Sequence, residues 1–303
     1  MRLSLTCFTP PPSAGDGKKQ KTMKTTKEKI FAYSYNSVTE FVNSIKDKEV
    51  NPLFQGVEAS MHESKYYTKF SSTENFTVAQ NLLKLGDTDN MKKLSAAGLN
   101  VGTVKSTGSA PRVQRYNNVV GFCPNVARFL QGAPDNMINV RRKIFKTSKV
   151  INVFFNISVC YKTKAKVIIQ TNAAFVNALL ALESKGYRVN LYAGKSSRVK
   201  DEFFICAVKI KDSATFFDKK KIAYPLVNPS FLRRHMFRAL ETSGVTYKDW
   251  PNSYGYPTTK NDDETIKAGL QKVGVKCDTI ISLTDILEMT SQEILDTCFA
   301  NRK

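Results

Sequence analysis

The chain has 303 residues, of which 42% are hydrophobic and 11% aromatic, so it can bury a sizeable core and wholesale disorder is excluded. Its mean hydropathy of −0.31 is typical of a water-soluble protein. The formal net charge is +20, from 46 Lys and Arg against 26 Asp and Glu. Such an excess attracts polyanions, although a genome rich in lysine codons would give the same composition.

The N-terminus lacks the features of an exported protein. The chain breaks at Pro10-Pro11-Pro12 before any apolar run long enough for a signal peptide, and Met23 is a second candidate for the initiator. The six cysteines are widely spaced and form no Cys-x-x-Cys pair, which argues against a disulfide framework. We therefore expect a cytoplasmic protein without a membrane span.

The N-terminal half gives the weaker structural signals. Residues 1–29 are rich in Pro, Gly, Lys and Thr, so we interpret them as a disordered basic tail. Residues 98–118 are rich in Gly, Ser and Thr and indicate a loop or irregular edge. Apolar spacing predicts three helices, at 33–46, 75–85 and 124–131. We expect residues 30–148 to form an accessory region that packs on the core.

From Lys149 onward the pattern is regular. Residues 150–157 are β-branched and aromatic, as in a strand covered on both faces. A long amphipathic helix at 167–183 and a strand at 187–192 follow, and this unit indicates a right-handed parallel crossover. The pattern then predicts a strand at 203–210, helices at 214–224, 229–242 and 263–272, a strand at 279–283 and a helix at 291–299. Residues 149–303 are therefore expected to form an α/β core, doubly wound around a mostly parallel sheet.

The loop after the first core strand reads Asn156-Ile-Ser158-Val-Cys160. With the strand before it and the helix after it, this loop resembles a degenerate von Willebrand factor A-type domain, which opens with a buried strand and an Asp-x-Ser-x-Ser loop. The resemblance implies a Rossmann-like fold over residues 149–241. In that family the Asp helps to hold a divalent cation. Because Asn156 replaces it, we transfer no metal ligand and expect no cofactor.

Three other stretches, at 121–134, 182–189 and 224–234, carry a second resemblance. They are similar to an uncharacterised family encoded in phage and mobile-element genomes. This resemblance implies a viral setting and no particular activity.

Side chains at the carboxyl ends of the predicted strands form a candidate ligand-binding edge, because open α/β sheets bind ligands there. The set is Asn156, Ser158, Tyr192, Lys195 and Asp285. Turn formation by Asn and Ser is the competing interpretation. The stretch Gly194-Lys-Ser-Ser197 lacks the upstream glycine of a phosphate-binding loop, so we interpret it as a turn.

Two basic clusters are candidate polyanion-binding sites, because guanidinium forks suit phosphate and carboxylate groups. The set is Arg141, Arg142, Lys143 and Lys146 before the first core strand, with Arg234 and Arg238 on a later helix. For the second cluster the alternative is a structural role, in which an arginine pairs with an acid such as Glu241.

The sequence contains two histidines, His62 and His235, neither in a catalytic signature, and no complete catalytic site. Our leading hypothesis is a phage-type, non-enzymatic binding protein that contacts protein or nucleic acid in replication, packaging or virion assembly. It would act in the cytoplasm of an infected cell or in the virion, and the oligomeric state stays open. The alternatives are a nucleotide or nucleic-acid processing enzyme that uses the carboxyl edge of the sheet, and a host-directed inhibitor.

Overall fold

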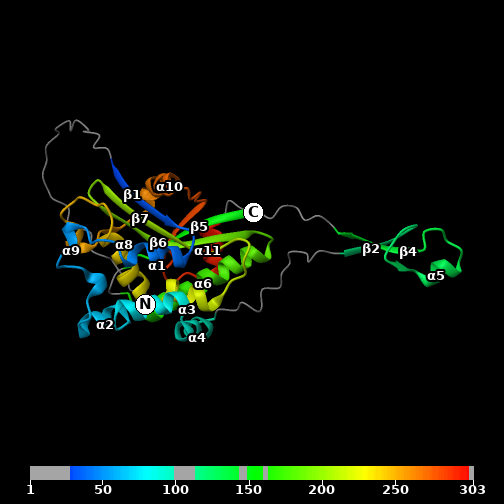
Figure 1. The fold of residues 1–303 in the computed structure, drawn as a ribbon, viewed down its shortest axis with the longest axis horizontal. Helices are drawn as coiled ribbons and strands as arrows, with labels where there is room; N and C mark the ends of the chain where they lie inside the picture. The colour runs from blue at the N-terminus through cyan, green and yellow to red at the C-terminus, as the bar shows by residue number, and fades with distance from the viewer. Residues whose placement is uncertain (1–27, 99–112, 143–148, 160–162, 300–303) are drawn as a thin grey trace.

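The structure is a computed structural model that describes residues 28–98, 113–142, 149–159 and 163–299 (Figure 1). We call residues 28–98 and 149–299 the body, and residues 113–142 the arm. Almost all of the expected tail at 1–29 lies outside the described residues, as do Lys143 and Lys146.

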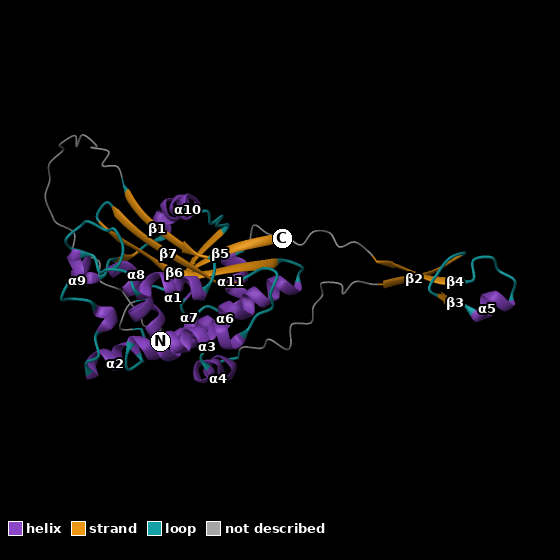
Figure 2. Ribbon diagram, viewed as in Figure 1, coloured by secondary structure: helices purple, strands orange, loops and turns teal. Residues whose placement is uncertain are grey.

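The body is built on a six-stranded sheet with helices on both faces (Figure 2). Its main path runs in the order β1 (Lys29–Tyr35), β7 (Glu202–Lys211), β6 (Arg188–Val199), β5 (Val150–Asn156) and β9 (Thr279–Ser282), and β8 (Tyr256–Pro257) pairs with β6. The pairs β1–β7, β5–β6 and β5–β9 are parallel, whereas β6–β7 and β6–β8 are antiparallel. The chain is thus a mixed α/β protein whose central sheet is mostly parallel, compatible with a Rossmann-like fold.

The predicted strand–helix–strand unit is present as β5, α6 (Ala165–Ser184) and β6, and β5 and β6 are parallel neighbours. Phe155 of β5 stacks on Phe175 of α6, with ring centroids 4.2 Å apart. By length and composition α6 could cross a membrane, but half of its most apolar window is buried inside the protein. Core helices of water-soluble proteins have the same properties, and α6 packs in the main core.

Strand β6 continues through Gly194-Lys-Ser-Ser197, where we expected a turn, and that prediction is wrong. The turn comes later, at Lys200, whose φ of 51° lets β6 pair with β7 as an antiparallel hairpin. A Cβ at Gly194 would lie 1.9 Å from the carbonyl oxygen of Cys206 on β7. The glycine therefore marks a close strand approach and not a strand end.

Strand β1 occupies the edge of the central sheet, in register with β7 from Lys29 to Tyr35. This corrects the expectation that residues 30–148 are wholly an accessory region, and it shortens the helix expected at 33–46. That helix is α1 (Val38–Lys46), and Ser37 caps its start because the Ser37 side chain accepts a hydrogen bond from the N–H of Glu40.

Helices cover the two faces of the sheet unequally (Figure 2). On one face α10 (Asp263–Lys272) buries Ile266 and Leu270 against Phe154, Tyr192 and Ile205. The opposite face holds the larger core. The remaining helical elements of the body are η1 (Pro52–Phe54), η2 (Ala59–Met61), α2 (Lys65–Ser71), α3 (Phe76–Leu85), α4 (Thr88–Ala96), α7 (Lys219–Val227), the π-helical η3 (Phe231–Met236), α8 (Phe237–Glu241), α9 (Trp250–Ser253), η4 (Lys260–Asp262), η5 (Leu283–Ile286) and α11 (Ser291–Cys298).

The arm is a small antiparallel sheet of order β2-β4-β3 with one short helix. Its elements are β2 (Val113–Asn118), β3 (Cys123–Pro124), α5 (Val126–Leu130) and β4 (Met137–Arg142). The end of the loop expected at 98–118 is therefore a strand, whereas residues 99–112 lie outside the described part. No side chain from 115 to 140 is buried, so the arm has no core of its own.

Candidate functional site

A buried cluster of neutral polar side chains lies at the carboxyl end of β5. It consists of Asn156, Ser158, Ser196 and Thr258, here called the hydroxyl cluster, and each is at most 6% exposed. The Asn156 side-chain oxygen accepts hydrogen bonds from the backbone N–H groups of Ser158 (3.1 Å) and Ser196 (3.3 Å). The Ser196 and Thr258 hydroxyls are 2.5 Å apart. The cluster therefore ties the end of β5 to β6 and to the segment after β8.

The Ser158 hydroxyl has no hydrogen-bond partner among the described residues, although its oxygen is buried. An unpaired buried hydroxyl is costly, so a water molecule or a small polar group would stabilise this position. Of the sequence-predicted edge, Asn156 and Ser158 meet here. Sequence reasoning missed Ser196 and Thr258, because β6 was expected to end at residue 192.

The hydroxyl cluster does not fit the divalent cation of von Willebrand A-type domains. Its donors are amide and hydroxyl groups without a carboxylate, and the Asn156 oxygen already accepts two backbone hydrogen bonds. Calcium and magnesium sites are built mainly around carboxylate oxygens. Within the described ranges, no group of three or more His, Cys, Asp or Glu could hold a metal ion.

Lys195, another residue of the predicted edge, belongs to a separate buried network. Its ammonium donates to the carbonyl of Tyr254 (2.7 Å) and lies 4.7 Å from the centre of the Phe237 ring. Burial lowers the pKa of Lys195 to about 7, opposed by the charge of Glu241. The Tyr254 hydroxyl donates to Glu241 (2.7 Å), and burial raises the pKa of that carboxyl group. Lys195 is only 4% exposed, so its ammonium is held inside this network.

No hydrogen bond joins Tyr192 or Asp285 to the hydroxyl cluster in the part of the chain that the structure describes. Tyr192 pairs in register with Phe154 and is buried in the smaller core, with the Lys209 ammonium 5.6 Å from its ring centre. Asp285 is half-buried on η5, and this burial raises the pKa of its carboxyl group while the charge of Lys260 lowers it. The five predicted edge residues are thus not joined in one hydrogen-bonded network.

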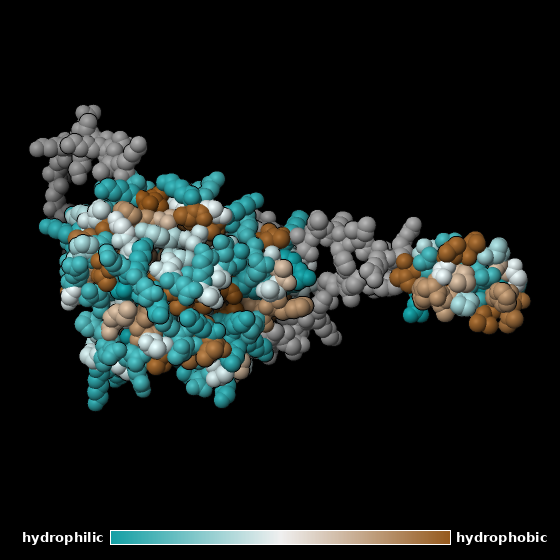
Figure 3. Space-filling model, in the orientation of Figure 1, coloured by the Kyte–Doolittle hydropathy of each residue, from teal (hydrophilic) through white to brown (hydrophobic). Residues whose placement is uncertain are grey.

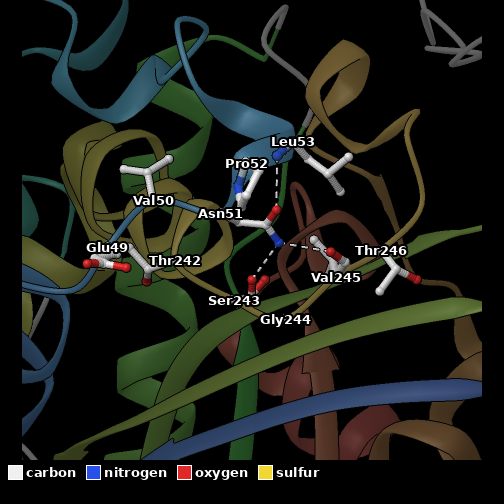
Figure 4. A pocket seen from close by; sticks show the side chains of 10 residues that line it. All are labelled: Glu49, Val50, Asn51, Pro52, Leu53, Thr242, Ser243, Gly244, Val245 and Thr246. Carbon is white, nitrogen blue, oxygen red and sulfur yellow. Dashed lines mark hydrogen bonds between the residues drawn. The ribbon is translucent and has the colours of Figure 1, made fainter.

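A shallow groove of about 500 Å³ lies elsewhere, between the segment after α1 and the segment after α8 (Figure 4). Asn51 donates from its side chain to the carbonyls of Ser243 (2.8 Å) and Val245 (2.9 Å). This amide therefore holds the two walls together. The lining residues are Glu49, Val50, Asn51, Pro52, Leu53, Thr242, Ser243, Gly244, Val245 and Thr246.

Arg234 and Arg238 are buried, which corrects their expected role in polyanion binding. Arg234 is 0% exposed, and its guanidinium donates to Thr73 and to the backbone carbonyls of Ser60, His62, Thr73 and Glu74. Arg238, 7% exposed, donates to the carbonyls of Ile45 and Lys48. Both arginines hold internal loops, which agrees with the structural alternative, although their hydrogen-bond partners are carbonyls and the Thr73 hydroxyl instead of an acid.

The other predicted basic cluster lies at the base of the arm. Arg141 and Arg142 end β4, where they pair in register with Gln114 and Val113. Residues 99–166, here called the basic segment, contain twelve Lys and Arg and one acid, Asp135. By contrast, residues 30–98 contain seven bases and eight acids. Most of the charge excess outside the N-terminal tail therefore belongs to the arm and the chain on either side of it.

These features define a mixed α/β protein with a mostly parallel sheet, a neutral polar cluster at one strand end and a basic arm. The chain belongs to the family described as "Domain of unknown function (DUF7192)", whose model matches residues 18–287. That match includes both the body and the arm. No curated protein and no solved structure gives a significant match.

Proposed function

We propose that this protein is a non-enzymatic binding protein that engages nucleic acid through the basic segment. The observation that carries the proposal is the charge of residues 99–166, with twelve bases and one acid. Lys and Arg at that density release condensed counterions from a phosphate backbone, and this release supplies most of the affinity of sequence-independent binding. A β-ribbon is a known means of contacting DNA.

The polar residues of the body also favour a non-enzymatic role. Its polar residues at the end of β5 bond mainly to one another and carry no carboxylate. Lys195 and Glu241, whose pKa values are shifted by burial, are held inside a closed network. We assign the body a von Willebrand A-like arrangement, because β5, its polar loop, α6 and β6 follow one another as that resemblance implies. In this proposal the body is a scaffold for the arm.

The setting we propose is a phage or mobile element, on the resemblance of residues 121–134, 182–189 and 224–234. Replication, packaging and virion assembly in an infected cell all handle nucleic acid, so a basic arm suits each of them. A protein partner bound at the same time is compatible with this function.

The test is the salt dependence of binding to fluorescently labelled DNA and RNA oligonucleotides, measured by anisotropy with the full chain. We expect log Kd to rise linearly with log salt concentration. The Arg141→Ala/Arg142→Ala double variant should bind more weakly, and its slope should be smaller by about 1–2, since each lost phosphate contact removes roughly 0.9.

The matched control is Lys92→Ala/Lys93→Ala, which removes two charges from exposed positions on α4 and keeps a helix-favouring residue. Its affinity and slope should stay near those of the wild type. Equal affinity and slope for the wild type and the Arg141/Arg142 variant would overturn the proposal for this arm. So would the absence of salt-dependent binding by the wild type.

A further inference from the structure

The arm tip, residues 119–136, exposes an apolar surface (Figure 3). Six large side chains on it are between 63% and 78% exposed. Exposed apolar patches larger than a few hundred Å² are rare on monomeric proteins and mark interaction sites. The six residues are Val119, Val120, Phe122, Val126, Phe129 and Leu130.

Three of these side chains form one face of α5. Val126, Phe129 and Leu130 follow the i, i+3, i+4 spacing that places residues on the same side of a helix. The helix buries none of its residues, so its apolar face is left without a packing partner in the described protein. An apolar stripe of this kind can pack against an identical stripe related by a twofold axis.

The arm lacks the disulfide or metal ion that often stabilises such a small unit. Units below about 40 residues generally need disulfides, metal ions or oligomerisation, because they cannot bury enough surface. Residues 113–142 contain one cysteine, Cys123, no histidine and one acid, Asp135. An internal disulfide is therefore impossible, and the arm has too few Cys, His and acidic side chains for an ordinary metal site. This composition favours association as a further source of stability.

The charge of the tip favours a second copy over a polyanion. Between residues 119 and 136 the charged residues are Arg128 and Asp135, and they form an ion pair with an N–O distance of 2.6 Å. Two tips can approach without net repulsion, while the unbalanced bases lie in the flanking parts of the basic segment. The exposed area of the six apolar side chains is on the order of 700 Å², close to the ~800 Å² that each partner contributes to a standard interface.

We propose that the arm tip is a dimerisation site, at which two copies of this chain pack their α5 faces and neighbouring apolar residues together. A dimer would present two basic segments to one nucleic acid, and the second contact would then form at a high effective concentration. The inference rests on the tip alone and does not require that the basic segment binds nucleic acid.

The test is the mass of the full chain, measured by sedimentation velocity over a range of concentrations. The wild type should sediment as a species of twice 34.0 kDa that dissociates on dilution. The Phe129→Asp/Leu130→Asp variant should weaken the dimer by at least roughly a hundredfold, because buried unpaired charges at two central positions are each strongly unfavourable.

The control variant is Phe216→Asp, since Phe216 is 87% exposed but lies on the body, and it should stay dimeric. Folding of the body is checked independently, because the single tryptophan, Trp250, is fully buried there and reports on the body alone. Both Asp variants should keep the fluorescence and unfolding midpoint of Trp250. A wild type that is monomeric at every concentration, or a folded tip variant that dimerises as tightly as the wild type, would overturn the proposal.

The two proposals fail separately. The tip variant should bind a short oligonucleotide with the wild-type salt slope, since its bases are intact. The Arg141→Ala/Arg142→Ala variant should remain dimeric while its salt slope falls. The tip variant, with an intact body, could instead lose both dimerisation and oligonucleotide binding. That result would show that the tip and the basic residues act as one surface, and it would overturn the proposal of a separate dimerisation site at the tip.

Discussion

The buried guanidinium of Arg234 gives the sharpest prediction about the body. It joins the π-helical η3 to η2 and to the chain between η2 and α3 through hydrogen bonds of 2.8–3.3 Å. Replacing Arg234 by Met keeps an apolar side chain of similar length but removes all five of these bonds. The variant Arg234→Met therefore isolates the contribution of the guanidinium group.

The expected loss of stability depends on which carbonyl acceptors can be hydrated after the substitution. His62 and Glu74 are exposed, so their carbonyls can be hydrated after the substitution. Ser60 and Thr73 are buried, at 0% and 5% exposure. The Ser60 carbonyl loses its Arg234 partner, whereas the Thr73 carbonyl keeps a hydrogen bond from the Ser71 hydroxyl at 3.1 Å. Since one unsatisfied buried acceptor costs about 1–3 kcal/mol, we expect Arg234→Met to lower the free energy of unfolding by about 2–3 kcal/mol.

Urea unfolding followed by Trp250 fluorescence and far-ultraviolet circular dichroism measures this loss. Arg234→Lys is the matched variant, because it keeps the charge and some of the donors, and it should fall between the wild type and Arg234→Met. A stability within about 1 kcal/mol of the wild type for Arg234→Met would refute the reasoning. If that stable variant also bound nucleic acid more weakly, the earlier prediction that Arg234 binds polyanions would be supported.

Two further predictions concern β6. Burial lowers the pKa of Lys195 from its ordinary 10.5 to about 7. Between these pH values the unfolded chain binds a proton that the folded chain does not, so the stability of the wild type should rise with pH. Lys195→Met should flatten this rise in urea midpoints between pH 7 and 10, and an unchanged slope would contradict the lowered pKa of Lys195. Gly194→Ala should cost at least about 3 kcal/mol because its Cβ would overlap the Cys206 carbonyl, whereas Gly244→Ala, whose nearest neighbour would lie at 3.6 Å, should be almost neutral in the same assay.

The fold could be predicted from the sequence where local pattern and tertiary packing agree. Strand β5 and helix α6 are apolar enough that their burial follows from their residues, and Ser37 caps α1 as its side chain suggests. The pattern was misleading where polar residues are buried. The run Gly194-Lys-Ser-Ser197 has the composition of a turn, yet partners distant in sequence satisfy Lys195 and Ser196 inside the sheet.

The candidate site was harder to predict for the same reason. Asn156 finds Ser196 and Thr258 only after β6 and β8 are in place, 40 and 102 residues further along the chain. The sequence suggests that Arg234 is a surface arginine. Its acceptors include backbone carbonyls, which every residue has, so no sequence pattern indicates them. Clustered basic residues therefore indicate a polyanion site only where the fold leaves them exposed.

The buried arginines and the bases of residues 99–166 are therefore expected to serve different properties, stability and binding. The arginines on η3 and α8 are used to hold internal loops, whereas the bases of residues 99–166 have one acid to pair with over that whole segment. Substitutions in the two regions involve different partners, and distant substitutions without shared partners act additively on stability. An Arg141→Ala/Arg142→Ala variant should therefore lose nucleic-acid affinity at an unchanged unfolding midpoint of Trp250. Arg234→Met should do the reverse, with a lower midpoint and, below that midpoint, an unchanged salt slope.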